Sequence, residues 1–188
     1  QRSVTTTRAK DSPVSALAVI GGGAAGFFAA ITAAEQAPCA AVTLYESGRR
    51  YLRKVKISGG GRCNVTHACF DPNDLAGHYP RGSRELRAAF HRWQPRDTFA
   101  WFEERGVALK TEDDGRVFPT TDSSQTIIDC LMTAARAAGI TLCPSVGLSG
   151  LTVEPGRGFR LELNDGAVAQ ADAVCIATGS LQASSAVL

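Results

Sequence analysis

Residues 19–26, Val-Ile-Gly-Gly-Gly-Ala-Ala-Gly, decide the fold class. They have the spacing G-x-G-x-x-G and lie between an apolar run typical of a buried strand and an apolar run typical of a helix. Gly21 would permit the tight turn, Gly23 would let the main chain approach a pyrophosphate, and Gly26 would let the helix pack closely on the strand. The start of the helix would then offer free N–H groups and a positive dipole end to that anion.

The segments on either side complete a strand–helix–strand unit. Residues 15–20 predict a short buried strand, residues 24–36 an apolar helix, and residues 41–46 a second strand. Such a unit has parallel strands and a right-handed crossover, so the predicted fold class is α/β. Glu46 ends the second strand twenty residues after Gly26, where its carboxylate can accept both ribose hydroxyls of an adenosine and would repel a 2′-phosphate. The sequence therefore predicts a dinucleotide site and argues against NADP at that site.

Composition limits the class of protein. The chain has 188 residues, 44% of them hydrophobic, which suffices for one compact domain or for part of a larger one. Its 20 Lys and Arg nearly balance its 18 Asp and Glu, so the net charge of +2 predicts no nucleic-acid partner and no acidic disordered tail. Residues 14–34 carry no charge, but three glycines, many alanines and the lack of a flanking Trp or Tyr belt argue against a membrane span. Residues 1–14 predict a flexible leader.

Six cysteines are scattered irregularly, at positions 39, 63, 69, 130, 143 and 175. In a chain able to build its own core, this scatter favours free thiols and a cytoplasmic protein over a disulfide framework. Cys63, His67, Cys69 and His78 form the only cluster of metal-ligand types in the sequence, and they lack the C-x-x-C spacing typical of zinc sites. We therefore expect no metal.

Two amphipathic helices are predicted in the middle of the chain. In the first, Leu86, Phe90 and Trp93 share one face; the second begins near Asp97, with Phe99 and Phe102 turned inward. Both helices are expected to be packing elements.

The last third of the chain predicts a further helix and then strands. Ser124 is expected to cap the helix, and Gly139 to end it in a left-handed conformation. The buried stripe of this helix would be Ile127, Ile128, Leu131, Ala135 and Ala138. Residues 148–154, 159–163 and 167–171 then alternate with period two, which predicts a three-stranded antiparallel meander.

A second unusual stretch is Lys54-Val55-Lys56-Ile57-Ser58-Gly59-Gly60-Gly61-Arg62-Cys63-Asn64. No acid lies between Glu46 and Asp71, and six basic residues do: Arg49, Arg50, Arg53, Lys54, Lys56 and Arg62. A solvated basic loop and a nucleic-acid patch are the plain alternatives, but only Tyr51 and Phe70 could offer stacking surfaces. Three successive glycines suit close approach of the main chain to a flat ring or a phosphate, so we predict a loop that covers a cofactor.

These stretches, together with Gly115-Arg116-Val117-Phe118-Pro119 and Ala177-Thr178-Gly179, resemble the BaiN/RdsA-like (aminoacetone-oxidase-like) family of NAD(P)/FAD-dependent flavoprotein oxidoreductases. The run S-G-G-G-R-C-N is the most specific of them, and the resemblance extends over about residues 16–179. It implies a Rossmann-like FAD-binding domain of the two-dinucleotide-binding-domain flavoprotein type, with a parallel sheet and an antiparallel meander. It also implies FAD as cofactor, NAD(P)H as electron donor in many members, and a small-molecule substrate.

The resemblance also assigns roles to residues. It places the FAD pyrophosphate on Gly21, Gly23, Ala24, Ala25 and Gly26, and the adenosine ribose on Glu46. Along the flavin would lie Lys54, Ser58, Gly59, Gly60 and Asn64, with Arg62 near the phosphates or the ring. Adenine would be held by the strand backbone at Leu148, and Thr178 and Gly179 would follow a last strand over 173–177 back to the cofactor. Either Lys54 or Arg62 could stabilise negative charge on the reduced flavin.

Cys63 is expected to be structural or to lie beside the cofactor. A redox pair would need a second cysteine, and Cys69 lacks the spacing of the flavin disulfide reductases. No general base is identifiable, because His67, His78 and His91 are better explained as surface or packing residues. The catalytic residues therefore stay unassigned.

The chain departs from the family in two motifs and in extent. His67 follows Thr66 where the family usually has Asn, and Ser180-Leu181-Gln182 replaces a glycine and an aromatic–proline turn. Compared with the family pattern, we expect the inserted substrate domain and the C-terminal return segment to lie outside these 188 residues. We therefore expect residues 15–188 to be an incomplete FAD-binding domain. Two alternatives to a flavoenzyme stay open: a truncated, non-catalytic fragment, and a simple NAD-binding Rossmann domain.

Overall fold

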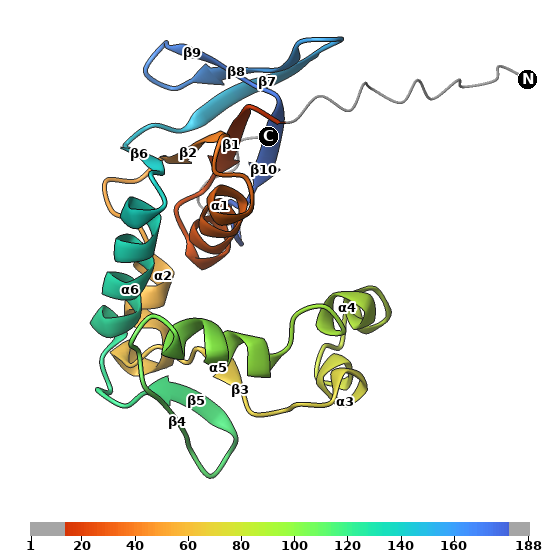
Figure 1. The fold of residues 1–188 in the computed structure, drawn as a ribbon, viewed down its shortest axis with the longest axis vertical. Helices are drawn as coiled ribbons and strands as arrows, with labels where there is room; N and C mark the ends of the chain where they lie inside the picture. Colours follow the sequence, from red (N-terminus) through yellow and green to blue (C-terminus); the bar gives the residue numbers. More distant parts are fainter. Residues whose placement is uncertain (1–13, 181–188) are drawn as a thin grey trace, which may run out of the picture. The chain divides into compact units, whose positions relative to one another are not determined.

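The computed structural model describes residues 14–180. Contacts divide the chain into two compact units, of which the first comprises the described residues 14–51 and 135–180, and the second residues 52–134. Figure 1 labels the elements of both. The predicted leader, except for Val14, lies outside the described residues, and the predicted domain over 15–188 stays a prediction.

A four-stranded parallel sheet forms the centre of the first unit. Its strands, in order across the sheet, are β10 (Ala173–Ile176), β1 (Ala16–Ile20), β2 (Ala41–Glu46) and β6 (Thr141–Pro144). Helix α1 (Ala24–Gln36) connects β1 to β2. The predicted α/β class and the strand–helix–strand unit are confirmed. The chain returns to the sheet at β6, after the helix that Gly139 ends, but the four residues of β6 give no clear hydrophobic period from which its bounds could be predicted.

An antiparallel meander forms the second sheet of this unit. Its strands are β7 (Leu148–Glu154), β8 (Gly158–Leu163) and β9 (Val168–Ala171), in that order, as the period-two pattern predicts. Side chains alternate along β1, so Ala18 and Ile20 share one face while Val19 lies on the other. Ala18 and Ile20 form one core cluster with Leu161 of β8. The meander therefore covers the face of β1 that carries Ala18 and Ile20.

Helix α1 packs with its apolar side buried. Phe27, Ala30 and Ile31 are completely buried, as are Val19 and Leu44 in the two strands that the helix connects. A strand that is buried on both faces of a parallel sheet has a continuous apolar sequence. The apolar run of β1 therefore predicts a strand buried inside the sheet.

Asp172, between β9 and β10, ties the end of the meander to the start of β1. Its Oδ2 accepts hydrogen bonds from the Ser15 N–H (2.8 Å), the Ser15 hydroxyl (2.7 Å) and the Ala16 N–H (2.8 Å). These bonds, the one from the Ser15 hydroxyl first, lower the pKa of Asp172 because they favour its charged form.

The second unit contains a small antiparallel sheet and several short helices. In the sheet the order is β3 (Thr66–His67), β5 (Arg116–Pro119) and β4 (Leu109–Thr111). The helices are α2 (Arg53–Ile57), α3 (Pro72–Gly77), α4 (Ser83–Phe90), α5 (Pro95–Glu103) and α6 (Ser124–Ala137), with the 3-10 turn η1 (Ser58–Gly61) directly after α2. Helix α6 begins in this unit and ends in the first. No helix within residues 14–180 combines the length and apolar character that crossing a membrane requires.

The two amphipathic helices differ from their prediction. Trp93 does not share a helical face with Leu86 and Phe90, because α4 ends at Phe90 and Trp93 is 40% exposed. Helix α5 begins at Pro95 instead of near Asp97. The Asp97 carboxylate accepts a hydrogen bond from the Gln94 N–H (2.7 Å), so Asp97 completes a capping box within the first turn.

The buried side of α5 also differs in part. Phe102 is buried as predicted, but the second buried aromatic of this helix is Trp101, and Phe99 is only half-buried. The Trp101 and Phe102 rings meet edge to face, with their centroids 4.9 Å apart.

Ser124 is the first residue of α6 and not its cap, because the hydroxyl of the preceding Ser123 accepts the hydrogen bond from the Gln125 N–H (3.3 Å). The Ser124 side chain is 1% exposed, and its hydroxyl donates to the carbonyl oxygen of Lys56 (2.9 Å), so it fastens α6 to α2. The other end of α6 agrees with the prediction: Gly139 has a φ of +71°, and the next N–H, that of Ile140, donates back to the carbonyl oxygen of Ala135 (3.1 Å).

We expect Asp172→Asn to lower the melting temperature at pH 7, because a neutral amide accepts the three hydrogen bonds less strongly than a carboxylate. A carboxyl whose pKa is lowered by folding contributes stability above its unfolded value, here 3.8, and loses that contribution as the pH falls through its folded value. The difference from wild type should therefore stay constant from pH 7 down to about pH 4 and shrink as the pH falls further below the unfolded value of 3.8. Thermal unfolding followed by circular dichroism measures it.

Asp113→Asn is the matched control, because Asp113 is exposed in the connection between β4 and β5. A pH-independent difference at Asp172, or an equal loss in the control, would contradict the assigned role.

Candidate functional site

The turn between β1 and α1 is built so tightly that two of its positions require glycine. A Cβ on Gly21, which has a φ of +113°, would lie 2.4 Å from the carbonyl oxygen of Ala177. A Cβ on Gly26 would lie 1.8 Å from the carbonyl oxygen of Gly21. The first and last glycines of the motif therefore let α1 begin directly against the end of β1.

Gly23 differs from Gly21 and Gly26, because the position that a side chain would occupy is open space. It is the N-cap of α1, with ordinary extended backbone, and a Cβ there would meet nothing within 4 Å. No side chain of the described residues caps this helix. The first turn of α1, from Ala24 to Gly26, has N–H groups without acceptors inside the helix. This end of α1 thus offers main-chain donors and the positive dipole end to an anion.

Glu46 brings a negative charge to the same turn. One carboxylate oxygen accepts a hydrogen bond from the Gly22 N–H (2.8 Å), and the other accepts one from the Gly48 N–H (2.7 Å). The two bonds fix the direction of the carboxylate, and both donors are neutral amides, so its charge is kept. The Ser47 hydroxyl, 3.5 Å from one of these oxygens, is a third neutral donor. A carboxylate has about four lone-pair positions, so acceptor capacity for at least one further donor is left.

Other predicted residues of the first unit lie near this turn. The Ala177 N–H donates to the carbonyl oxygen of Ile20 (2.8 Å), so β10 leads Thr178 and Gly179 past the turn. A Cβ on Gly21 would be 3.0 Å from the Cα of Thr178. Leu148, at the start of β7, lies two residues after Val146, whose N–H donates to the Glu46 carbonyl oxygen (2.9 Å).

The glycine-rich run 58–61 belongs to the second unit and is a compact turn. Gly59, Gly60 and Gly61 all have positive φ, of +56°, +69° and +88°. A Cβ on Gly59 would lie 2.8 Å from the ring of Phe118, whereas a Cβ on Gly60 would meet nothing within 4 Å. The structure therefore places a short helix and a turn packed on β5 where the sequence predicts a covering loop.

The predicted polar residues around the glycine run have local partners or lie at the surface. The Ser58 hydroxyl donates to the carbonyl oxygen of Val55 (3.0 Å), the Asn64 side chain pairs with the Val117 N–H (3.3 Å), and Lys54 is exposed. Ser58 and Asn64 thus serve to shape the turn and to fasten it to β5.

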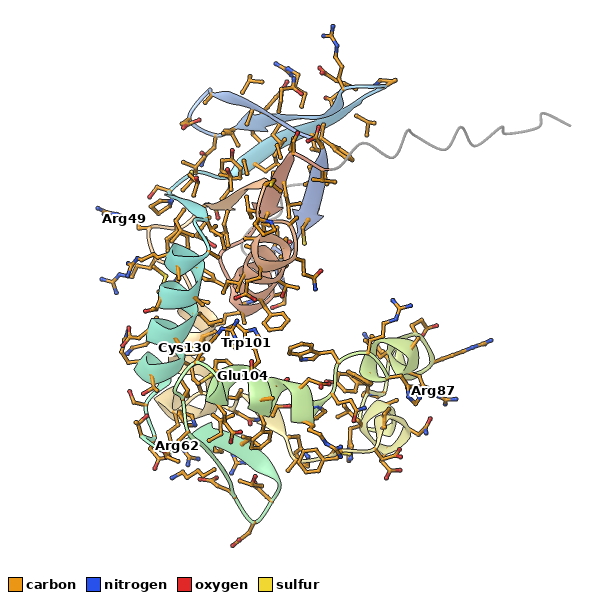
Figure 2. The ribbon with its side chains drawn as sticks, viewed as in Figure 1. Arg49, Arg62, Arg87, Trp101, Glu104 and Cys130 are labelled. Atoms are coloured by element: carbon orange, nitrogen blue, oxygen red, sulfur yellow. The ribbon has the colours of Figure 1, made fainter. Side chains whose placement is uncertain are left out.

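Arg62 is held by acids that lie fifty or more residues further along the chain. Its guanidinium is paired with the Glu112 carboxylate and lies 3.6 Å from that of Asp122; Figure 2 labels Arg62. It also stacks 4.0 Å over the ring of Phe118. The hydrogen bond to Glu112, followed by the charges of both acids, raises the pKa of Arg62. The positive charge of Arg62 is therefore paired with carboxylates. The local sequence does not predict this pairing, because it contains no acid between Glu46 and Asp71.

Cys63 is buried, with a φ of +64° and its N–H bonded to the Ser58 carbonyl oxygen (3.0 Å). Burial raises the pKa of its thiol, and a hydrogen bond with Ser58 opposes part of that rise. All six cysteines are free thiols. Within the described residues no group of three or more His, Cys, Asp or Glu side chains is arranged to hold a metal.

The comparison with protein families decides the assignment. The HI0933-like protein Rossmann domain matches residues 15–186. The chain belongs to this family. Among curated proteins, the HI0933-like chain is 32% identical over 164 residues to the ribosomal RNA dihydrouridine synthase of Escherichia coli, covering 87% of the chain and 39% of that protein. It is 28% identical over 163 residues to the 3-dehydro-bile acid delta(4,6)-reductase of Clostridium scindens, covering 87% and 38%.

Solved structures share the fold of the HI0933-like chain. A flavocytochrome c3 fumarate reductase has a TM-score of 0.63 at 22% identity, with 88% of this chain and 33% of that chain covered. THI4 of Thermovibrio ammonificans has a TM-score of 0.55 at 16% identity, with 88% and 57% covered. The family resemblance, the fold class and the resemblance to oxidoreductases predicted from the sequence are confirmed. The chain spans about two fifths of the length of the two curated relatives.

We expect substitutions of Gly26 and Gly23, in the turn between β1 and α1, to differ in their effect on stability. Gly26→Ala should unfold the first unit or lower its stability by more than about 2 kcal/mol, because the new Cβ would overlap a fixed main-chain oxygen. Gly23→Ala should change stability by less than about 1 kcal/mol, since the Cβ enters open space. Urea denaturation of the two variants tests this. Similar losses in both would mean that the turn is not packed as described.

Proposed function

We propose that this chain is the dinucleotide-binding part of a flavoprotein oxidoreductase and that it binds FAD. The observation that carries the proposal is the Glu46 carboxylate, held by two main-chain amides beside the open first turn of α1. The residues present fit the adenosine diphosphate half of such a cofactor, because the space beyond Gly23 is free and flanked by main-chain donors on one side and an anchored acid on the other.

In this proposal each part of the site has a separate task. The N–H groups at the start of α1 bind the diphosphate, and Glu46 accepts the ribose hydroxyls and disfavours a 2′-phosphate. Leu148, Thr178 and Gly179 of the first unit, and Lys54, Ser58, Gly59, Gly60, Arg62 and Asn64 of the second, are proposed as further binding residues. When bound, FAD supplies the hydride- and electron-transfer chemistry, and the protein orients it. The redox names of curated and structural relatives, a reductase and a fumarate reductase, support this class of reaction.

NAD(P)H is the proposed electron donor, because the resemblance to the NAD(P)/FAD-dependent family implies it. We also place the protein in the cytoplasm, since six free thiols agree with a reducing compartment. We propose a small molecule as the substrate of this oxidoreductase.

The cofactor proposal predicts a selective gain in heat stability. FAD should raise the melting temperature of the purified chain more than equal concentrations of NAD or NADP. Glu46→Gln should weaken FAD binding roughly 10- to 100-fold, because a charged acceptor of two hydrogen bonds becomes neutral and loses one acceptor oxygen. Glu35→Gln, at the exposed end of α1, should bind as wild type does.

The contrary outcomes favour different alternatives. Protection by NAD and not by FAD would favour the simple NAD-binding domain. Failure of FAD, NAD and NADP alike to protect a folded chain would favour a non-catalytic fragment.

An arginine-rich segment supports RNA as a second candidate substrate. Five arginines between positions 78 and 96 are exposed, namely Arg81, Arg84, Arg87, Arg92 and Arg96, and Figure 2 labels Arg87 on α4. Glu85 is the one acid in that stretch. Tyr79, Trp93 and Phe70 are 42%, 40% and 45% exposed, so aromatic surfaces for base stacking lie in or close to the basic segment.

The name of the Escherichia coli relative adds to this candidate, since that protein is called ribosomal RNA dihydrouridine synthase. The sequence-based prediction of no nucleic-acid partner rests on the net charge of the whole chain, and a local cluster of like charge can bind a polyanion in a nearly neutral chain.

If RNA is the substrate, Arg84→Ala with Arg87→Ala should weaken binding of a fluorescent single-stranded RNA and lower its salt dependence. Removing two phosphate contacts should reduce the slope of log K against log salt by about 1.4. The control variant, Arg136→Ala with Arg157→Ala, removes two exposed arginines outside the arginine-rich segment. It should leave the RNA affinity and its salt dependence unchanged. Fluorescence anisotropy at several salt concentrations measures them. An equal effect of the two pairs would leave only non-specific attraction and contradict an RNA surface on α4.

A further inference from the structure

Tyr51, which no motif singles out as a site residue, lies directly against the glycine turn. A Cβ on Gly22 would be 2.5 Å from Cδ1 of Tyr51, so the main chain at Gly22 rests on the tyrosine ring. The ring also meets the completely buried ring of Phe27 edge to face, with centroids 5.5 Å apart. Tyr51 thus packs between the turn and the second turn of α1, on the side where Gly22 donates to Glu46.

The hydroxyl of Tyr51 is buried and has no hydrogen-bond partner among the described residues. Its surroundings keep it protonated: burial, with the nearby Cys143 and Glu46, raises the pKa of Tyr51 to about 12. The hydroxyl is therefore a donor at any physiological pH.

A buried hydroxyl without a partner lowers the stability of a protein, and a phenylalanine would fill the same space without that cost. Such groups in native structures call for an explanation, and a bound water or ligand is the usual one. Two groups near the hydroxyl could accept: the Glu46 carboxylate, whose oxygens bond to the Gly22 and Gly48 N–H groups, and the Cys143 thiol, which is a weak acceptor. No hydrogen bond joins the hydroxyl to either group in the described structure.

We propose that Tyr51 is a binding residue for the adenosine diphosphate half of the dinucleotide, its hydroxyl donating to that half directly or through one ordered water. The proposal rests on the proposed function, because it supposes a dinucleotide at the Gly21–Gly26 turn. The Glu46 carboxylate and the Tyr51 ring both lie against Gly22. A dinucleotide bound at the turn would thus have an acceptor beside it, and a donor once the buried Tyr51 hydroxyl came within reach of the ligand or of a water.

Tyr51→Phe tests the proposal, because it removes the hydroxyl and keeps the ring that supports Gly22. Isothermal titration with FAD and with ADP should show both ligands weakened by the same factor, about 5- to 10-fold. The melting temperature of the ligand-free variant should equal or exceed that of wild type, because the donor without a partner is gone. Tyr45→Phe is the matched control: Tyr45 is also half-buried, on β2, but packs in the cluster of Ala18 and Ile20 and should bind as wild type does.

Two results would overturn the proposal while wild type binds FAD and ADP. Unchanged affinity in Tyr51→Phe would show that the hydroxyl does not serve the ligand. A lower ligand-free melting temperature would show that it has a structural partner within the protein or a structural water. If folded wild type binds neither FAD nor ADP, the proposed function itself fails, and the role of Tyr51 falls with it.

Discussion

The approach of Gly26 to the carbonyl oxygen of Gly21 is the constraint on which the first unit depends. At that separation no side-chain atom fits, so α1 starts directly at the end of β1. The same turn directs the Gly22 N–H to Glu46 and opens the first turn of the helix at Gly23. One steric requirement thus sets both the packing of the helix on the sheet and the arrangement of charge and donors at its end.

A charged residue lies beside each of the two glycine-rich runs, 21–26 and 58–61, and the two residues are held by different kinds of partner. Glu46 is held by uncharged amides, which direct the carboxylate without cancelling its charge. Arg62 is paired with Glu112 and Asp122, acids that it shares with Arg116 and Lys110. Dipoles direct a charged group without pairing its charge, whereas counter-ions pair with it, so the two charged residues are held in different ways.

The parts of this structure that local sequence determines were predictable, and the rest depends on contacts between distant segments. The β1–α1–β2 unit and the meander follow from glycine spacing, hydrophobic period and a turn at 164–166. Ser124 reads as a cap by composition, yet its hydroxyl meets a carbonyl sixty-eight residues earlier in the chain. The partners of Arg62 and the burial of Tyr51 likewise arise only when the chain has folded. Short strands such as β3 and β6 carry too few residues to show a period.

The order of strands in the parallel sheet has a consequence for synthesis of the chain. β1 pairs on one side with β2, which follows soon after it, and on the other with β10, where Leu17 is opposite Ala173. A ribosome delivers residues 52–134 between those two events, so this inserted unit can acquire structure while β1 still has a bare edge. Closing that edge is a long-range step that must wait for β10, so the β1–α1–β2 segment presents an unpaired strand edge, a site for misassociation with other nascent chains, until β10 has been made.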